Sequence, residues 1–175
     1  MSIFPTKVLL ATDGSQEAEL ALRTAVDLAI STDSELHILT VAREYHPAYE
    51  IPEYGTQLEQ TLRRIEQQVQ EVLDEQVRKV EDAGGTVAEA HLKMEGRPDR
   101  EIVRLGEEIG AGLIVMGSRG LGGLRRALMG SVSDSVVRHA HCPVLVVRPH
   151  EGSESRARHF MRRGSAARSR GSGLE

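Results

Sequence analysis

A glycine-rich segment between two apolar stretches carries the residue types best suited to binding an anion. It runs from Gly117 to Ser131, leaves an apolar stretch over 112–117 and enters a helical pattern of valines. Backbone N–H groups at the start of a helix lack internal partners and lie at the positive end of the helix dipole, so they attract anions. Glycines allow a phosphate to approach the backbone, and three arginines add positive charge. The segment therefore predicts a phosphate site, in which Ser131 offers a hydroxyl and an N–H and can cap the helix.

Other nucleotide motifs fit this chain less well. A P-loop requires Gly-Lys-Ser or Gly-Lys-Thr, which does not occur in the sequence. A dinucleotide fingerprint requires a third glycine, but Arg125 stands three residues after Gly122, and the segment follows the fourth expected strand instead of the first. The motifs of a protein kinase are also missing.

The elements that must position the glycine-rich segment alternate between strand and helix. Short apolar stretches predict buried strands, and longer stretches with apolar residues at every third or fourth position predict helices. The strands are expected over 7–13, 35–41, 86–94, 112–117 and 143–147. The helices are expected from Ser15, after a loop over 42–56, from 96–99 and from Ser131. This alternation predicts an α/β domain, with a parallel sheet and helices on both faces.

Composition indicates the cellular compartment in which such a domain is expected. The single cysteine, Cys142, excludes an intrachain disulfide and fits a reducing compartment. The first seven residues do not resemble a signal peptide, and no apolar run approaches the roughly 20 residues that a membrane-spanning helix needs. We therefore expect a cytoplasmic protein with no membrane insertion.

Charge is distributed unevenly along the 175 residues. Residues 1–149 carry a net charge of −7, whereas residues 150–175 carry +3. An acidic body lacks the clustered lysine and arginine that phosphate backbones require, so nucleic acid is not expected as a partner. We expect one nucleotide-binding domain over 1–149. The arginine-, serine- and glycine-rich segment 150–175 is expected to be a disordered tail.

Four segments taken together resemble the universal stress protein family of the ATP-binding type. The first is the spacing Gly117-x-x-Gly120, nine residues, then Gly130-Ser131. The others lie at 8–15 (VLLATDGS), 95–98 (EGRP) and 142–147 (CPVLVV). The resemblance covers about residues 5–149. The glycine pattern alone is moderately specific, but the four segments in this order are highly specific.

The resemblance implies an open five-stranded parallel sheet of order 3-2-1-4-5, as in adenine nucleotide α-hydrolase-like folds. In that order the first and fourth strands are neighbours at the point where the winding reverses. Ligands of open α/β sheets bind beyond the carboxyl ends of the strands at such a point. Asp13 and Gly117, which end these two strands, should then lie at one crevice.

The resemblance also implies how a nucleoside would bind there. Ala11, Thr12 and Asp13 would line it, with Asp13 near the ribose or a phosphate-bound metal. Val41 would contact adenine through its backbone. For Asp13 the alternative is a plain cap of the following helix, although Ser15 can fill that role alone.

The remaining contacts implied by the resemblance are to the ribose and the triphosphate. Met116 and Gly117 would pack beneath the ribose and phosphates. The triphosphate would be held by Arg119, Gly120, Gly130, Ser131, Val132 and Ser133. Mg²⁺ would bridge the phosphates, since it keeps several waters and rarely takes an all-protein site. No residue is assigned as catalytic or as a metal ligand.

Three functions remain open on the sequence alone. The first is an ATP-binding regulatory protein of the stress response that acts as a switch or sensor toward an unknown partner. The second is an ATPase, which would be slow because no general base or nucleophile is evident beside the phosphates. The third is a nucleotide-independent interaction module: the resemblance implies homodimers through the last strand, Pro143 to Val147, which would otherwise leave an apolar sheet edge exposed.

Other reactive side chains are given structural interpretations. His139, His141 and Cys142 cannot easily converge on a metal where a helix turns into a strand. Cys142 is interpreted as a small packed residue, because no base is apparent beside it in the sequence. His37 is interpreted as structural or as lying on the sheet face.

Overall fold

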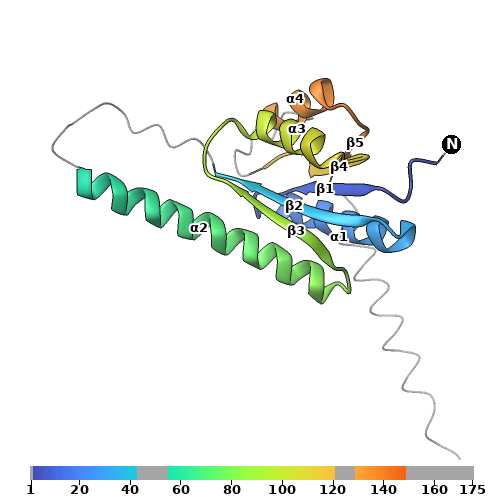
Figure 1. Cartoon of the computed structure of the whole chain (residues 1–175), viewed down its shortest axis with the longest axis horizontal. Coiled ribbons are helices and arrows are strands. Elements are labelled where there is room, and N and C mark those ends of the chain that lie inside the picture. Colours follow the sequence, from blue (N-terminus) through green and yellow to red (C-terminus); the bar gives the residue numbers. More distant parts are fainter. Residues whose placement is uncertain (1, 43–54, 121–128, 149–175) are drawn as a thin grey trace, which may run out of the picture.

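A computed structural model describes residues 2–42, 55–120 and 129–148 of the chain (Figure 1). The strands are β1 (Lys7–Ala11), β2 (Glu35–Val41), β3 (Val87–Lys93), β4 (Leu113–Gly117) and β5 (Val144–Val147). The helices are α1 (Gln16–Thr32), α2 (Gly55–Asp82), α3 (Pro98–Ile109) and α4 (Ser131–His139). The expected alternation of strand and helix is therefore confirmed. The expected tail over 150–175, and with it the domain boundary at 149, lies outside the described residues.

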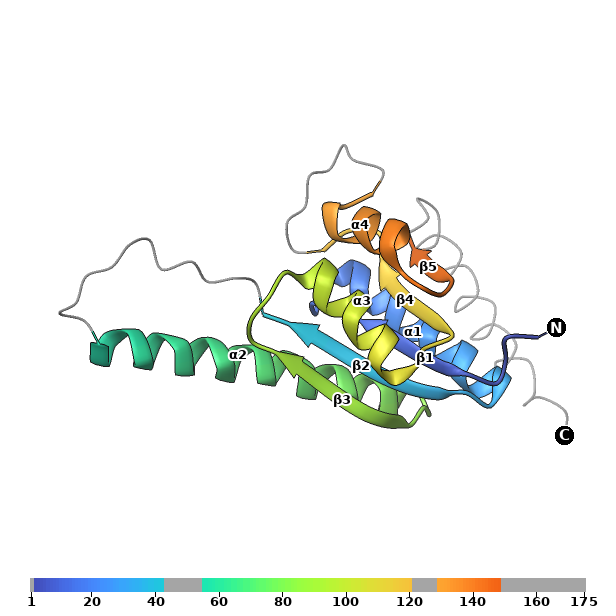
Figure 2. The ribbon, with the colours of Figure 1, turned by 45° about the horizontal axis from the view of Figure 1, so that its top comes forward.

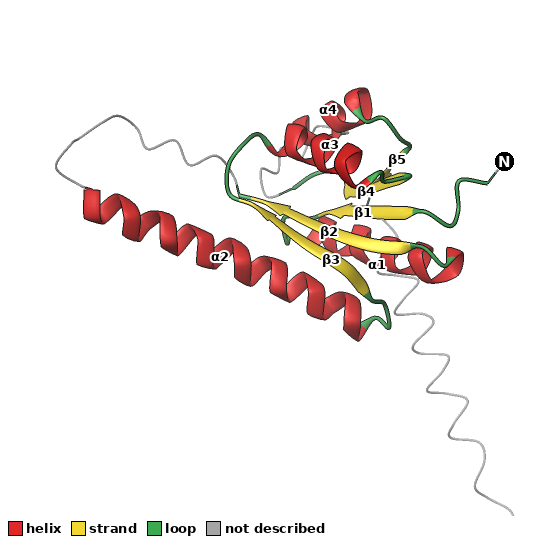
Figure 3. Cartoon of the chain, viewed as in Figure 1, coloured by secondary structure: helices red, strands yellow, loops and turns green. Residues whose placement is uncertain are grey.

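All five strands join one parallel sheet in the order β3-β2-β1-β4-β5 (Figure 3). Strand β1 is central: Leu10 pairs with Ile38 of β2 on one side and with Val115 of β4 on the other. This is the predicted order, and the winding direction reverses between β1 and β4. Since all strands are parallel, their carboxyl ends meet at the same edge of the sheet.

Helices cover both faces of the sheet, as Figure 2 shows, with α1 and α2 on one face and α3 and α4 on the other. Alternate residues of each strand point to opposite faces. Val8, Leu10 and Ile38 therefore pack beneath α1 and α2, whereas Leu9 and Ile114 pack beneath α3 and α4. Covering both faces explains why β1 and β4 read as continuous apolar runs.

Helix α2 is longer than the sheet that it covers. Its C-terminal half packs on the core through Leu73 and Val80, while Leu62, in its N-terminal half, is 45% exposed. Figure 1 shows that half extending past the end of the sheet. The apolar stripe of α2 therefore belongs to the core in the second half of the helix. No helix in the described part of the chain is both long enough and apolar enough to cross a membrane.

Candidate functional site

A cavity of about 290 Å³ opens at the carboxyl ends of β1, β2 and β4. This volume lies just below the usual range of small-molecule sites, about 300–1,000 Å³. All twelve residues that the sequence suggested for nucleotide binding line it: Ala11, Thr12, Asp13, Val41, Met116, Gly117, Arg119, Gly120, Gly130, Ser131, Val132 and Ser133. The structure therefore brings them together at one place, the point where the winding reverses. Their role in binding stays a prediction.

The turn between β1 and α1 is held by its own side chains. The Thr12 hydroxyl accepts a hydrogen bond from the Gly14 N–H (3.2 Å), and the Asp13 carboxylate accepts one from the Ser15 N–H (3.1 Å). Such local bonds compete with strand pairing. The Thr12 N–H still donates to the Leu39 carbonyl of β2 (3.0 Å), and the two side-chain bonds then turn the chain away, so β1 ends at Ala11, two residues earlier than predicted. Ser15 caps α1 by accepting from the Ala18 N–H, as predicted.

The end of β4 and the start of α4 are joined through Ser118. Its N–H donates to the Val147 carbonyl, and its carbonyl accepts from the Gly130 N–H, both at 2.8 Å. The buried Ser133 hydroxyl lies within hydrogen-bond distance of the carbonyls of Ser118 (2.9 Å) and Gly130 (3.0 Å). Ser133 therefore fixes the first turn of α4 against the strand and presents that turn to the cavity.

The N-cap of α4 lies one residue earlier than the sequence predicts. Gly130, not Ser131, is the N-cap, and no side chain caps the helix. Glycine offers no side-chain acceptor, so the first N–H groups of α4 are left for another partner. These donors, beginning at Ser131, adjoin the cavity. Such a helix start favours an anion.

Gly120 lies against the carboxylate of Asp13. A Cβ atom added at position 120 would meet Asp13 Oδ2. Gly117 is similarly confined, since its Cβ would lie 3.3 Å from the backbone of Glu17 in α1. A side chain at position 120 would thus displace the Asp13 carboxylate, and one at position 117 would press on the backbone of α1.

Arg119 forms an ion pair with Glu17, a residue that the sequence did not suggest for the site. The Arg119 Nε lies 3.0 Å from Glu17 Oε1 in the first turn of α1. The second carboxylate oxygen, Glu17 Oε2, is buried and has no hydrogen-bond partner among the described residues. The Arg119 guanidinium is thus held at the rim of the cavity by an incompletely satisfied carboxylate.

Five residues that the sequence did not suggest also line the cavity: Ala18, Leu39, Pro98, Ile102 and Met129. They are apolar, so no chemical signal marks them. Pro98 belongs to the segment over 95–98 that contributed to the family resemblance, and this was the one available clue. Leu39 and Ile102 share a buried cluster with Ala11 and Met116, against which Val41 packs, so this part of the cavity has an apolar wall suited to a flat ring.

Asp99, in the first turn of α3, ties that helix to α4. It accepts hydrogen bonds from Arg97 Nη2 (2.9 Å) and from the Ser135 hydroxyl (2.6 Å). Burial favours the neutral carboxyl, but the bonds from Ser135 and Arg97 outweigh it and hold the pKa of Asp99 below its ordinary value. The carboxylate is therefore charged in the folded state and stabilises the packing of α3 against α4.

Asp99→Asn is expected to destabilise the fold by about 1–3 kcal/mol at neutral pH. Because the pKa of Asp99 is lowered on folding, its contribution is complete above the ordinary aspartate pKa and is lost as the pH falls through the folded-state value. Urea unfolding should therefore show a smaller difference between variant and wild type at about pH 3 than at pH 7. Asp134→Asn, at an exposed ion pair on α4, is the control. An Asp99→Asn effect that does not change with pH would contradict this account.

The two histidines at the end of α4 lie within hydrogen-bond distance of backbone carbonyls. His139 Nδ1 bonds to the Ser135 carbonyl (2.7 Å), and His141 Nε2 to the Ala111 carbonyl (3.1 Å). Cys142 packs against the core beneath α3 and α4, and burial raises the pKa of its thiol. The thiol form of Cys142 is thus favoured, as expected for a packed residue and not for a nucleophile.

Comparisons with known proteins all lead to one family. The model of the universal stress protein family matches residues 5–148. A universal stress protein of Methanocaldococcus jannaschii is 36% identical over 142 residues, which make up 81% of each chain. The structure of the universal stress protein UspA from Lactobacillus plantarum superposes with a TM-score of 0.68 at 26% identity, covering 83% of this chain and 99% of that one. A universal stress protein solved in complex with cAMP gives a TM-score of 0.58 at 29% identity, covering 82% and 97%.

Proposed function

The chain belongs to the universal stress protein family, and from this premise we propose that it is a cytoplasmic, ATP-binding regulatory protein of the stress response. ATP would act as the ligand of a switch or sensor and not as a substrate of rapid turnover. One observation carries the proposal. Strand ends, a glycine-rich rim and an uncapped helix start meet at a single cavity where the winding of the sheet reverses.

The two parts of the cavity match the two parts of the ligand. The uncapped start of α4 and the Arg119 guanidinium suit a polyphosphate. The apolar wall suits a purine ring, with the backbone of Val41 beside it and the Asp13 carboxylate in reach of ribose hydroxyls. The relative crystallised with cAMP supports an adenine nucleotide as the ligand class.

Magnesium would bind in this cavity together with the nucleotide and not at a protein site of its own. Asp13 is the sole carboxylate among the described residues that line the cavity. One carboxylate is too few for a dedicated protein site, but it suits Mg²⁺ held chiefly by phosphates and water. When bound, the ion would neutralise phosphate charge next to Asp13.

Slow ATP hydrolysis is the second candidate function. Among the described residues that line the cavity there is no histidine or cysteine, and the single carboxylate already accepts a bond from the Ser15 N–H. A positioned base contributes about 10²–10⁴-fold to such reactions. Hydrolysis is therefore expected to be slow, and binding is the better supported role.

We also propose that the chain forms a homodimer through β5. This strand lies at the edge of the sheet, and its four residues, all valine or leucine, are each only half-buried within one chain. An apolar edge strand is a template for pairing, and a second copy would cover it. Light scattering should give twice the chain mass, and a monomer at micromolar concentration would contradict the proposal.

Mass spectrometry of nucleotide released from the denatured, purified protein is the direct test of the ATP proposal. ATP at close to one molecule per chain would support it. Protein that arrives empty and also fails to bind added Mg·ATP in calorimetry would overturn it, and a nucleotide-independent interaction module would then be favoured.

Glu17→Gln is expected to tighten ATP binding a few-fold. Glu17 competes with the phosphates for Arg119, and a partly exposed ion pair of this kind has a free energy of about 0.5–1 kcal/mol. The control is Glu19→Gln in the same helical turn, which pairs with Arg23 and Lys79 instead. Calorimetry should show unchanged affinity for the control, whereas equal or weaker binding in Glu17→Gln would argue that Arg119 does not reach the phosphates.

A further inference from the structure

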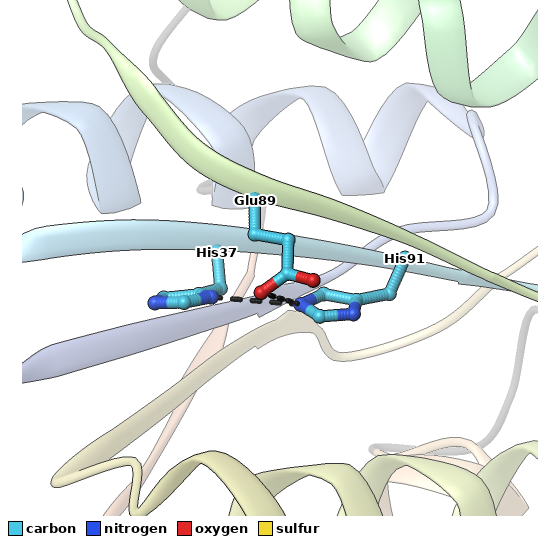
Figure 4. A group of neighbouring side chains, drawn as sticks. All are labelled: His37, Glu89 and His91. Carbon is cyan, nitrogen blue, oxygen red and sulfur yellow. Dashed lines mark hydrogen bonds and ion pairs between the residues drawn. The ribbon is translucent and has the colours of Figure 1, made fainter.

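Three potential metal ligands converge on the sheet, away from the nucleotide cavity (Figure 4). His37 comes from β2, and Glu89 and His91 from the neighbouring edge strand β3. Figure 4 shows the two rings and the carboxylate directed toward one another. One nitrogen or oxygen of each residue lies within 4.8 Å of the others. Within the described residues this is the one such group of three, and none of its members lines the cavity.

The strand register explains why these side chains meet. His37 pairs with Glu89 across β2 and β3, and Leu39 pairs with His91, after a register shift next to Leu36. Residues two apart on a strand share a face, so all three project to the side of Leu39, which packs beneath α3. Their backbones are fixed by the sheet, and the group is therefore largely preorganised.

The distances suit coordination of a small cation better than direct contact. His37 Nδ1 and His91 Nε2 are 3.5 Å apart, at the outer limit of a hydrogen bond, and His91 Nε2 is 3.7 Å from Glu89 Oε2. Two ligand atoms about 2.0–2.1 Å from a tetrahedral zinc ion lie roughly 3.3 Å from each other. Small movements of the exposed Glu89 side chain and of the rings would complete such a geometry.

The second ring nitrogen of His37, Nε2, also has surroundings that suit a metal ligand. His37 is 5% exposed, and its Nε2 is buried with no hydrogen-bond partner among the described residues. The nearest acid, Glu35, places Oε2 at 3.5 Å from that nitrogen. A histidine that binds metal through one nitrogen usually donates its other N–H to a carboxylate, which fixes the ring and the tautomer. Metal at Nδ1 would put the proton on Nε2, facing Glu35.

We propose that His37, Glu89 and His91 form a binding site for a divalent cation of the zinc class. The donor set of two imidazoles and a carboxylate favours Zn²⁺ and similar transition metals over Mg²⁺ and Ca²⁺, which take oxygen ligands. Three protein ligands leave a fourth position for water. The bound ion would cross-link the edge strand β3 to β2.

A stacked pair of neutral histidines is the competing explanation. The ring centroids lie 5.8 Å apart with 18° between the planes, and burial lowers the pKa of His91, which keeps it neutral. This explanation gives no reason for the carboxylate of Glu89 to turn toward both rings. A neutral His91 is equally what metal binding requires, because the lone pair must be free.

Calorimetric titration of the chelator-treated full chain with Zn²⁺, in the absence of nucleotide, tests the proposal. One ion per chain is expected, with affinity falling at least about 30-fold in His91→Gln and about 10-fold in Glu89→Gln. The matched control is His139→Gln, an exposed histidine on α4 that should stay within about two-fold of wild type. Glu89 is exposed, so its variant keeps the fold even if His91→Gln does not.

Cobalt gives an independent readout of the same site. Co²⁺ bound by two histidines and a carboxylate should give the visible absorption of a tetrahedral site in wild type and in His139→Gln, and lose it in His91→Gln. Wild-type protein that binds neither ion overturns the proposal. Equal binding by wild type and His91→Gln also overturns it, since the ions would then be held by other histidines of the chain.

Discussion

Gly120→Asp is expected to abolish ATP binding, lowering affinity at least about 100-fold, because juxtaposed like charges cost several kcal/mol at an interface. A Cβ at position 120 already meets Asp13 Oδ2, and both residues line the cavity. The new side chain would bring a second carboxylate beside Asp13 and against the phosphates. Calorimetry with Mg·ATP measures the loss, and unchanged affinity would remove Gly120 from the site.

Two matched variants separate charge from size. Gly120→Ala adds the Cβ without the charge, so it should weaken binding by less than the aspartate variant. Gly84→Asp introduces the same side chain after α2, at φ +83° with nothing within 4 Å of its Cβ. Aspartate tolerates this left-handed conformation, so binding should be retained. If Gly84→Asp also lost ATP, the effect at Gly120 would reflect general destabilisation.

The fold follows from the sequence because local and global signals agree in this chain. The strand β2 was predicted at its observed bounds, since polar residues at 31–34 precede its largely apolar run. Helix α3 starts at Pro98, as the preference of proline for a first turn indicates. Boundaries failed where side chains bond to nearby backbone: Thr12 and Asp13 end β1 early, and glycine replaces serine as the cap of α4.

The polar rim of the cavity was predictable, whereas its apolar wall was predictable only in part, through the family resemblance that implied Ala11, Val41 and Met116. Motif spacing marks glycines, serines and the aspartate, because close approach and hydrogen bonding restrict which residue types fit. Ile102 and Ala18 reach the cavity only through the packing of α3 and α1. An apolar residue on the inner face of a helix looks the same in the sequence whether it meets the core or a ligand.

The histidine cluster shows a different limit of sequence reasoning. His37 was interpreted as structural or as lying on the sheet face, but its partners depend on the pairing of β2 with β3 and on the register shift beside Leu36. A shift of one residue would turn Glu89 and His91 to the opposite face. Strand register is set by the assembled sheet, so the sequence alone does not specify this cluster.

Gly14→Ala is expected to destabilise the protein by about 2–5 kcal/mol and to weaken ATP binding. Gly14 has φ +73°, a conformation that costs an alanine about 1–2 kcal/mol. Its added Cβ would also lie 2.9 Å from Val72 Cγ1 of α2, and overpacking of this kind costs about 1–3 kcal/mol. Urea unfolding measures the total, with Gly84→Ala, where the φ is similar and the space is open, as the control for the conformational part alone.

Val72→Ala distinguishes the two causes, because it removes the methyl group that the new Cβ meets. The double variant should be more stable than the sum of the two single effects by about 1–3 kcal/mol, the part due to overpacking. ATP binding should recover in parallel, because Gly14 directly follows Asp13 in the turn that borders the cavity. Helix α2 also contacts this turn through the buried Gln76, whose side-chain oxygen accepts a hydrogen bond from the Thr12 hydroxyl (3.3 Å). Strictly additive effects would mean that α2 does not press on the turn. Coupling would instead make α2 the support that holds Thr12 and Asp13 at the edge of the cavity.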